Sequence, residues 1–115
     1  MNHAADVRAV IVLTTLGADA DAVAFGRLLV EAGVAACVSV LPPMTSIYRW
    51  KGSVNEDREQ QLMIKTTHDC IALLETRLRE IHPYELPEFL VIPIEGGSSS
   101  YLGWLQDSTG PATSA

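Results

Sequence analysis

Residues 81–88 of the chain read Ile81-His82-Pro83-Tyr84-Glu85-Leu86-Pro87-Glu88. Each proline fixes its own φ angle and disfavours a helical conformation at the residue before it. An amphipathic helical pattern precedes the stretch, and the apolar run 89–94 follows it. The stretch therefore predicts a rigid corner where a helix ends and a strand begins. It also brings an imidazole, a phenol and two carboxylates into one short connection, which makes it the first place to look for chemistry.

On both sides of this corner, strand-like and helix-like patterns alternate. Runs rich in β-branched residues predict strands, whereas apolar residues three and four apart predict helices. Asp19 is a candidate N-cap for the first helix, whose expected apolar face is Ala20, Val23, Ala24 and Leu28. We expect strands at 8–15, 34–40, 45–50 and 89–94, helices at 20–32, 67–82 and 98–107, and a proline interruption at 42–43. A hairpin turn at 51–53 leads into a further strand that reaches residue 66.

The order of these elements is β-α-β-β-α-β with a short C-terminal helix, which is the ferredoxin-like α+β arrangement. We expect a single domain over residues 8–107, a flexible leader at 1–7 and a flexible tail at 108–115. Right-handed crossovers place both central helices on one face of the sheet. The other face is left uncovered, and the first and last strands are apolar. The pattern therefore predicts an oligomer that forms through this face or through the extended hairpin.

The composition limits the classes of function. With 115 residues, 48% of them hydrophobic and 19% charged, the chain suits one globular domain. Its net charge of −6 argues against a nucleic-acid partner, and no apolar run approaches the ~20 residues of a membrane span. The two cysteines, Cys37 and Cys70, form no CxxC motif, so we expect reduced thiols and a cytoplasmic location.

Five stretches in the same chain point to one family. They are Ala35-Ala36-Cys37-Val38, the run 45–52 (TSIYRWKG), Ile64-Lys65-Thr66, the run 82–88 (HPYELPE) and the run 101–105 (YLGWL). Together they resemble the CutA family of divalent-cation tolerance proteins, over nearly the whole chain from about Val10 to Trp104. The resemblance implies a fold similar to that of the PII signalling proteins, a homotrimer, binding of copper and other divalent ions, and no enzymatic activity.

His82 is the leading candidate for a metal ligand, because a neutral imidazole binds copper and zinc readily. The structural alternative is a histidine at a helix end that interacts with the last carbonyls. The resemblance implies that some bacterial members have a cysteine at the position of Thr14 and a second histidine at that of Ile81. These two proposed ligands are absent here, so a cation at His82 needs carboxylates such as Glu59 or Glu85, or repeated copies around a trimer axis.

Other candidates lie on the strands. Cys37 is a possible soft-metal ligand, although a small buried hydrophobe is the more ordinary role. Glu59 and Lys65 are six residues apart on one strand, so both project from the same face. With Tyr84, Glu85 and Trp50 they predict a polar cleft between subunits. The alternative for the charged pair is an ion-pair network that fixes the register of the trimer.

Three classes of function follow from these residues. The first is a trimeric protein that binds divalent cations, copper(II) ahead of zinc(II), with no organic cofactor. The second is a PII-like sensor of a small ligand, or a structural trimer, that uses the cleft between subunits. The third, an enzyme, is disfavoured because no nucleophile–base pair is evident from spacing.

Overall fold

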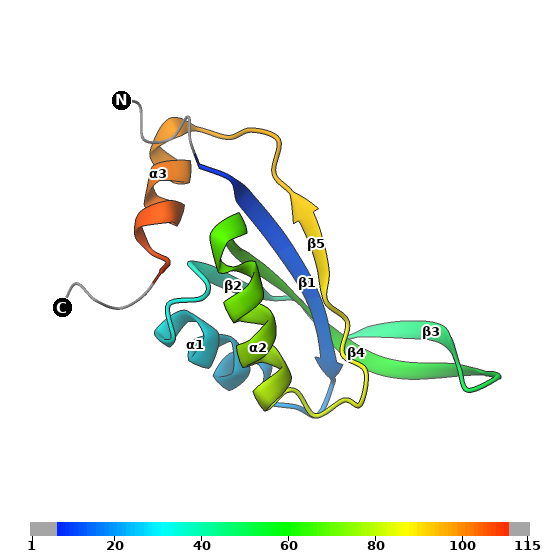
Figure 1. Ribbon diagram of the computed structural model, residues 1–115. Coiled ribbons are helices and arrows are strands. Elements are labelled where there is room, and N and C mark those ends of the chain that lie inside the picture. The colour runs from blue at the N-terminus through cyan, green and yellow to red at the C-terminus, as the bar shows by residue number, and fades with distance from the viewer. Residues whose placement is uncertain (1–6, 111–115) are drawn as a thin grey trace.

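The computed structural model describes residues 7–110, and its elements follow the expected order (Figure 1). A short 3-10 helix, His68–Cys70, leads into the second α-helix. The strands are β1 (Ala9–Gly17), β2 (Cys37–Val40), β3 (Met44–Trp50), β4 (Ser53–Thr67) and β5 (Leu90–Pro93), and the helices are α1 (Ala22–Glu31), α2 (Ile71–Ile81) and α3 (Ser99–Asp107).

The strands form one antiparallel sheet in the order β2-β4-β1-β5. At 15 residues, β4 is long enough to pair with β2 through one half and with β3 through the other. Pro42 and Pro43 separate β2 from β3, because a proline cannot donate to the ladder. The hairpin of β3 and β4 projects well beyond the rest of the molecule (Figure 1). This arrangement confirms the ferredoxin-like α+β fold.

One side of the sheet is covered by α1 and α2, which lie on the same side of it in Figure 1. Alternate residues of β1 and β4 point to this covered side and are fully or nearly fully buried, as the period of two requires. They pack against Phe25 and Leu29 of α1 and Leu74 and Leu78 of α2. The strand residues of the covered side are Val10, Val12, Thr14, Leu16, Leu62, Ile64 and Thr66.

The other side of the sheet, here called the open side, is not covered by α1 or α2. Its members on β1 and β4 are mostly half-buried, in contrast to the full burial opposite. On the edge strand β5, Leu90 and Ile92 pair with the open-side residues Leu13 and Ile11 and are 55% and 44% exposed. The residues of the open side are Ile11, Leu13, Thr15, Glu59, Gln61, Met63 and Lys65.

Two details of α1 differ from the expectation. Its N-cap is Asp21 and not Asp19, and an Asp21 carboxylate oxygen accepts a hydrogen bond from the Ala24 N–H at 3.0 Å. The buried face is Ala22, Phe25, Gly26 and Leu29, whereas the predicted members Val23 and Leu28 are 61% and 52% exposed. The physical reason is close packing on β2. A Cβ on Gly26 would lie 2.9 Å from the Val38 Cγ1 atom, so only a glycine face lets the helix approach this closely.

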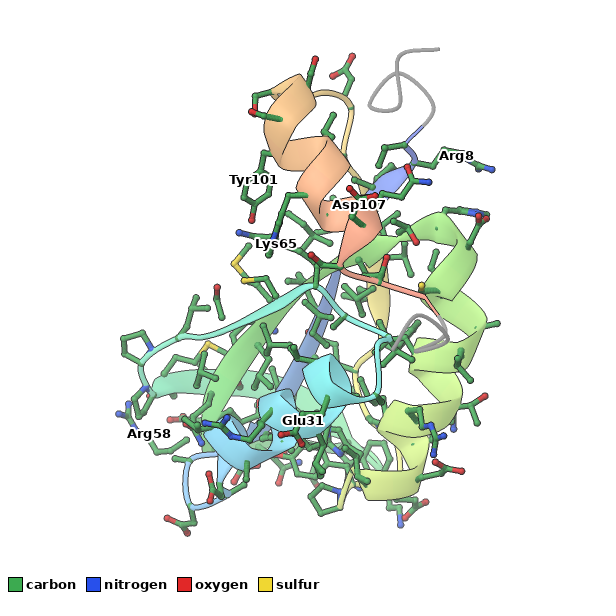
Figure 2. The ribbon with its side chains drawn as sticks, turned by 90° about the vertical axis from the view of Figure 1, so that its left-hand side faces the viewer. Arg8, Glu31, Arg58, Lys65, Tyr101 and Asp107 are labelled. Atoms are coloured by element: carbon green, nitrogen blue, oxygen red, sulfur yellow. The ribbon has the colours of Figure 1, made fainter. Side chains whose placement is uncertain are left out.

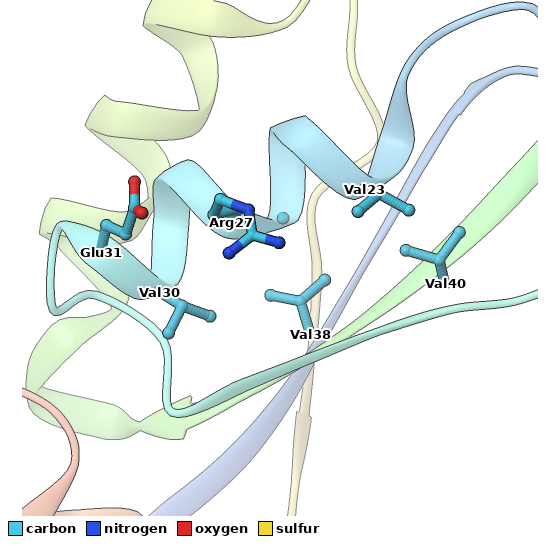
Figure 3. Close-up of a pocket in the computed structure, with 7 residues that line it drawn as sticks. Val23, Arg27, Val30, Glu31, Val38 and Val40 are labelled. Atoms are coloured by element: carbon cyan, nitrogen blue, oxygen red, sulfur yellow. The ribbon is translucent and has the colours of Figure 1, made fainter.

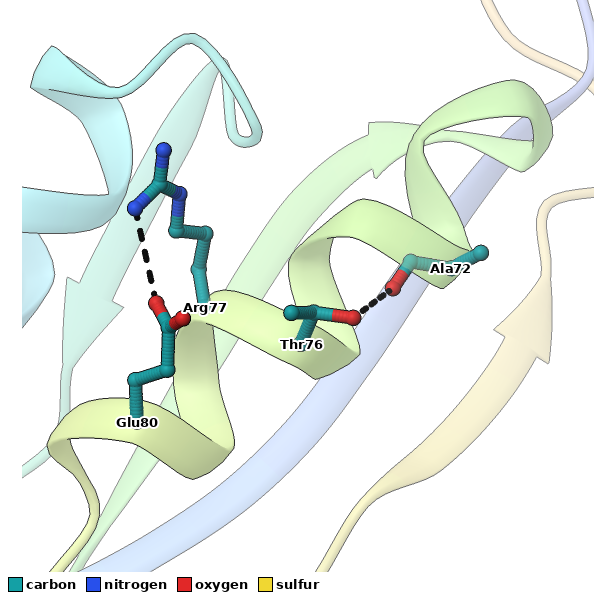
Figure 4. Close-up of polar contacts among 4 residues, drawn as sticks. All are labelled: Ala72, Thr76, Arg77 and Glu80. Carbon is teal, nitrogen blue, oxygen red and sulfur yellow. Dashed lines mark hydrogen bonds and ion pairs between the residues drawn. The ribbon is translucent and has the colours of Figure 1, made fainter.

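The amphipathic pattern that precedes the corner is confirmed at the centre of α2. Leu74 and Leu78 are fully buried, while Ile81 at the last turn is 37% exposed. The outer surface of this helix carries the Thr76 hydroxyl, which donates to the Ala72 carbonyl, and an ion pair of Arg77 with Glu80 at 3.4 Å (Figure 4).

The described C-terminal part packs at the end of the sheet where β1 begins (Figure 1). Ser98 caps α3, since its hydroxyl accepts from the Tyr101 N–H, and Leu105 is fully buried. Beyond α3, the Gly110 N–H donates to the Gly33 carbonyl at 2.8 Å. The predicted leader and tail otherwise fall on residues 1–6 and 111–115, outside the described residues. No helix within residues 7–110 has the length and apolar character to span a lipid bilayer.

Candidate functional site

His82 lies at the C-terminal end of α2 and is buried, and both of its ring nitrogens are engaged. Nε2 lies 2.8 Å from the Thr15 carbonyl oxygen, to which it donates in the neutral tautomer. Nδ1 accepts the Tyr84 backbone N–H at 3.1 Å. Burial lowers the pKa of the imidazole, although the Thr15 carbonyl and Glu59 oppose this. The residue therefore holds the corner against β1, and it could bind a metal only by releasing one of these hydrogen bonds.

Tyr84 continues the corner to the open side. Its hydroxyl donates to a Glu59 carboxylate oxygen at 2.7 Å, and its ring lies 4.8 Å from that of His82. Burial, followed by the bond to Glu59, raises the pKa of the phenol far above its ordinary value, so Tyr84 remains a donor at any physiological pH. Three predicted site residues, His82, Tyr84 and Glu59, are thus brought together.

Glu59 is only 8% exposed, although it carries a carboxylate. Within residues 7–110, Tyr84 is the one side chain that donates a hydrogen bond to it, and no basic side chain there lies at ion-pair distance from it. A nearly buried carboxylate with a single neutral donor is electrostatically incomplete, because burial of a charge is costly without a counter-charge.

Two glutamines beside Glu59 support the same corner and were not predicted. Gln61 on the open side donates through Nε2 to the Thr14 carbonyl at 2.8 Å and to a Glu88 carboxylate oxygen at 2.9 Å. Gln60 points the other way and donates to the carbonyls of Gly17 and Ala20 at 3.0 and 3.1 Å. Their adjacent positions in the strand were the signal that could have identified them. Two successive glutamines in a strand place one side-chain amide on each face, and both amides need hydrogen-bond partners.

Lys65 lies near the other end from Glu59 of the part of β4 that pairs with β1. Its ammonium is 3.4 Å from the Tyr101 hydroxyl and 5.6 Å from the centre of that ring, and Figure 2 shows the two side chains directed toward each other. Cys37 pairs with Lys65 across β2 and β4, and its sulfur is 4.0 Å from the Ser39 hydroxyl. The predicted residues Cys37 and Lys65 are therefore distant from the corner of His82.

The last two predicted residues lie on the hairpin side of the molecule. Glu85 is exposed and lies 3.9 Å from the Lys51 ammonium, which also lies 5.6 Å from the centre of the Trp50 ring. An exposed pair of this kind contributes little stability. Within the described residues, no three side chains of His, Cys, Asp or Glu are grouped so that they could hold a metal ion.

A shallow groove of about 340 Å³ lies elsewhere, between α1 and β2 (Figure 3). Its walls are Val23, Val30, Val38 and Val40, and Arg27 and Glu31 are its charged members. No predicted site residue lines it.

Comparison with known proteins finds similarity over nearly the whole domain. The family model described as CutA1 divalent ion tolerance protein matches residues 10–108. A divalent-cation tolerance protein CutA from Thermus thermophilus is 43% identical over 100 residues, which cover 87% of this chain and 97% of the relative. The crystal structure of CutA1 from Oryza sativa superposes with a TM-score of 0.86 at 33% identity, covering 90% of this chain and 95% of that one. A PII-like protein CutA from Nostoc in apo form gives a TM-score of 0.82 at 38% identity, covering 89% and 98%.

Proposed function

The chain belongs to the CutA1 divalent ion tolerance protein family, and from this premise we propose that it is a homotrimeric, non-enzymatic protein that binds divalent cations and contributes to tolerance of them. The observation that carries the proposal is Glu59, a carboxylate 8% exposed with a tyrosine hydroxyl and no basic partner in the described chain. A divalent cation supplies the missing positive charge.

The residues around Glu59 suit weak binding better than a closed metal centre. The polar neighbour of the carboxylate within residues 7–110 is the Tyr84 hydroxyl oxygen, whereas both nitrogens of His82 are already engaged. A tight copper or zinc site needs about three or four protein ligands with nitrogen or sulfur among them. We therefore propose that Glu59 is the first cation ligand, that His82 positions Tyr84 and through it Glu59, and that copper(II) binds ahead of zinc(II), as the general affinity order predicts.

The trimer is supported by the surface that one chain leaves uncovered. The apolar side chains of β5 and the half-buried open side require a partner if they are to leave water. Light scattering at micromolar concentration should give the mass of three chains, and a monomer would contradict the assembly. The unpaired thiols of Cys37 and Cys70 support a cytoplasmic location.

Calorimetric titration with copper(II) and with zinc(II) tests the cation site. We expect Glu59→Gln to weaken binding at least about tenfold, or ~1.4 kcal/mol, and the exposed control Glu75→Gln to bind like the wild type. Equal affinities of Glu59→Gln and wild type would remove Glu59 from the site. No binding of either ion to the wild type would contradict the cation-binding function itself.

A variant of His82 separates the two roles proposed for that residue. If His82 only positions Tyr84, His82→Asn should weaken cation binding less than Glu59→Gln does, provided that circular dichroism shows a retained fold. A greater loss in His82→Asn would instead make the imidazole the principal ligand.

A second candidate is a PII-like sensor of a small anionic or zwitterionic ligand. Lys65 favours it, because this cation has no acidic partner in the described residues and stands beside Tyr101 and Trp104, which are 43% and 45% exposed. Thermal-shift measurements with a series of small carboxylates and amino acids test this candidate. A shift in the wild type that Lys65→Gln abolishes would support the sensor.

A further inference from the structure

Two opposite charges on the same strand lack a counter-charge among residues 7–110. Glu59 and Lys65 both project from the open side of β4, and neither lies within ion-pair distance of an oppositely charged side chain among residues 7–110. Six residues of strand separate them by roughly 20 Å, at about 3.3 Å per residue. They cannot meet within one subunit, so neither finds its counter-charge among residues 7–110.

The acidic end of the strand is rigid. We define it as Glu59, Tyr84, Gln61 and Glu88. The Tyr84 hydroxyl fixes the Glu59 carboxylate at 2.7 Å, and His82 fixes the Tyr84 backbone through its Nδ1 atom. Gln61 holds Glu88 at 2.9 Å. This end therefore presents negative charge in a fixed place, and no basic side chain of the described part of the chain forms an ion pair with it.

The basic end of the strand is equally defined. It consists of Lys65, Tyr101 and Trp104. The Lys65 ammonium rests against Tyr101 (Figure 2), whose ring is 5.2 Å from that of Trp104. An ammonium has three N–H donors, and Tyr101 accepts one of them. The cation is thus held against the Tyr101 ring and retains donors for a carboxylate.

We propose that Lys65 of a second copy of this chain is the counter-charge of Glu59, so that the acidic end of each subunit lies against the basic end of the next. Charge complementarity selects this partner, and the half-buried open-side residues between the two ends supply the apolar contact. Two different patches on one chain generate a heterologous interface, and such an interface closes into a ring when its rotation permits. The inference rests on the homotrimer and on Glu59 as cation ligand, both proposed above.

One consequence concerns the strength of cation binding. If the partner's Lys65 neutralises Glu59, a divalent cation reaches the carboxylate only by displacing that ammonium. The ammonium and the cation then compete for one carboxylate, and removal of Lys65 has opposite effects on two measurable quantities. Assembly should weaken while cation affinity rises.

The experiment combines sedimentation equilibrium with the copper(II) and zinc(II) titrations, on wild type, Lys65→Gln, Lys65→Arg and Glu59→Gln. Lys65→Gln should raise the dissociation constant of the assembly at least about tenfold, as loss of a buried charge pair does, and should increase cation affinity several-fold. Lys65→Arg keeps the charge and should assemble like the wild type. Lys51→Gln removes an exposed lysine and serves as the matched control. Circular dichroism identifies any variant that has lost its fold.

The charge exchange decides the pairing. Glu59→Lys and Lys65→Glu should each dissociate the assembly, and the double variant should restore it. Dissociation of the double variant equal to that of the single variants would overturn the pairing, as would wild-type assembly by Lys65→Gln. Neither result bears on the proposed cation binding, which is tested by the cation affinity of the wild type compared with that of Glu59→Gln. Conversely, if the wild type assembles but binds no cation, the proposed cation-binding function is wrong. The pairing of Glu59 with Lys65 is then still decided by the charge-exchange variants.

Discussion

The two sides of the sheet use the same strands for different purposes. On the covered side, β1 and β4 present Val12, Leu62 and Ile64, each fully buried under α1 and α2. On the open side, the intervening positions of β4 are Glu59, Gln61, Met63 and Lys65, of which only Glu59 is classed as buried. The period of two places these sets back to back. The comparison teaches that one side makes the fold, while the other is free to carry charge.

The largest expected effect on stability concerns α2, one of the two helices that pack on the covered side of the sheet. Leu74→Ala, at a fully buried position of α2, should lower the free energy of unfolding by about 2–5 kcal/mol because it leaves a cavity. The neighbouring Leu73 is 49% exposed, so Leu73→Ala is a matched control that should cost less than about 1 kcal/mol. Urea unfolding at one fixed protein concentration measures both. Equal losses would mean that α2 does not face the sheet through Leu74.

The next largest effect concerns His82, the residue that links the two sides of the sheet. Burial lowers the pKa of His82 below its ordinary value of 6.5. The unfolded chain therefore binds a proton at a higher pH than the folded chain does, and stability falls as the pH drops below about 6.5. The slope is at most about 1.4 kcal/mol per pH unit. Unfolding between pH 7.5 and 5 should show this loss in the wild type and a smaller one in His82→Asn. The same slope in both would assign the titration to another group.

Two buried threonines on the covered side should respond in opposite directions. The Thr14 hydroxyl has no hydrogen-bond partner in the described structure, whereas the Thr66 hydroxyl donates to the Val34 carbonyl at 2.8 Å. Thr14→Val should raise the free energy of unfolding by about 1 kcal/mol, and Thr66→Val should lower it by about 1–2 kcal/mol. Thermal unfolding distinguishes them. A loss of stability in Thr14→Val would show that its hydroxyl has a partner.

The smallest effect is expected on the outer surface of α2. Arg77 and Glu80 form an ion pair at 3.4 Å with both side chains more than half exposed (Figure 4). Arg77→Ala should change the free energy of unfolding by about 0.5 kcal/mol or less. A double-mutant cycle with Glu80→Ala at low and high salt measures the coupling. A coupling above about 1 kcal/mol would contradict the assignment of this surface to solvent.

The sequence was sufficient for the order of strands and helices, because prolines, glycines and hydrophobic periods are local signals. The corner at His82 and Pro83 was found in this way, and so was the break at Pro42 and Pro43. The predicted buried face of α1 was wrong because the close contact of Gly26 with Val38 decides which face of the helix packs on the sheet. No local sequence pattern contains this contact. The N-cap was misplaced by two residues for a related reason, since Asp19 and Asp21 are equally good capping residues and the turn geometry decides.

The site was only partly accessible from the sequence. Even spacing correctly put Glu59 and Lys65 on one face, and the corner correctly brought Tyr84 close to Glu59. Spacing could not show that His82 uses both ring nitrogens on backbone groups, because one of them belongs to Thr15, 67 residues away. Gln60 and Gln61 were overlooked for the same reason, since their partners are carbonyls of Thr14, Gly17 and Ala20 and the Glu88 carboxylate, all distant in the sequence. Metal binding by His82, Glu59 and Cys37 stays a prediction.

The pairing of β1 with β4 also has a consequence for synthesis of the chain. Ala9 pairs with Thr67 and Gly17 with Glu59, so β1 leaves the ribosome long before its partner does. At about 5–20 residues per second, the delay is roughly 3–12 seconds. The local hairpin of β3 and β4 forms within roughly 10 μs once it has emerged. During translation the apolar run of β1 is therefore the segment exposed longest, and it is the segment that a chaperone on the nascent chain would protect.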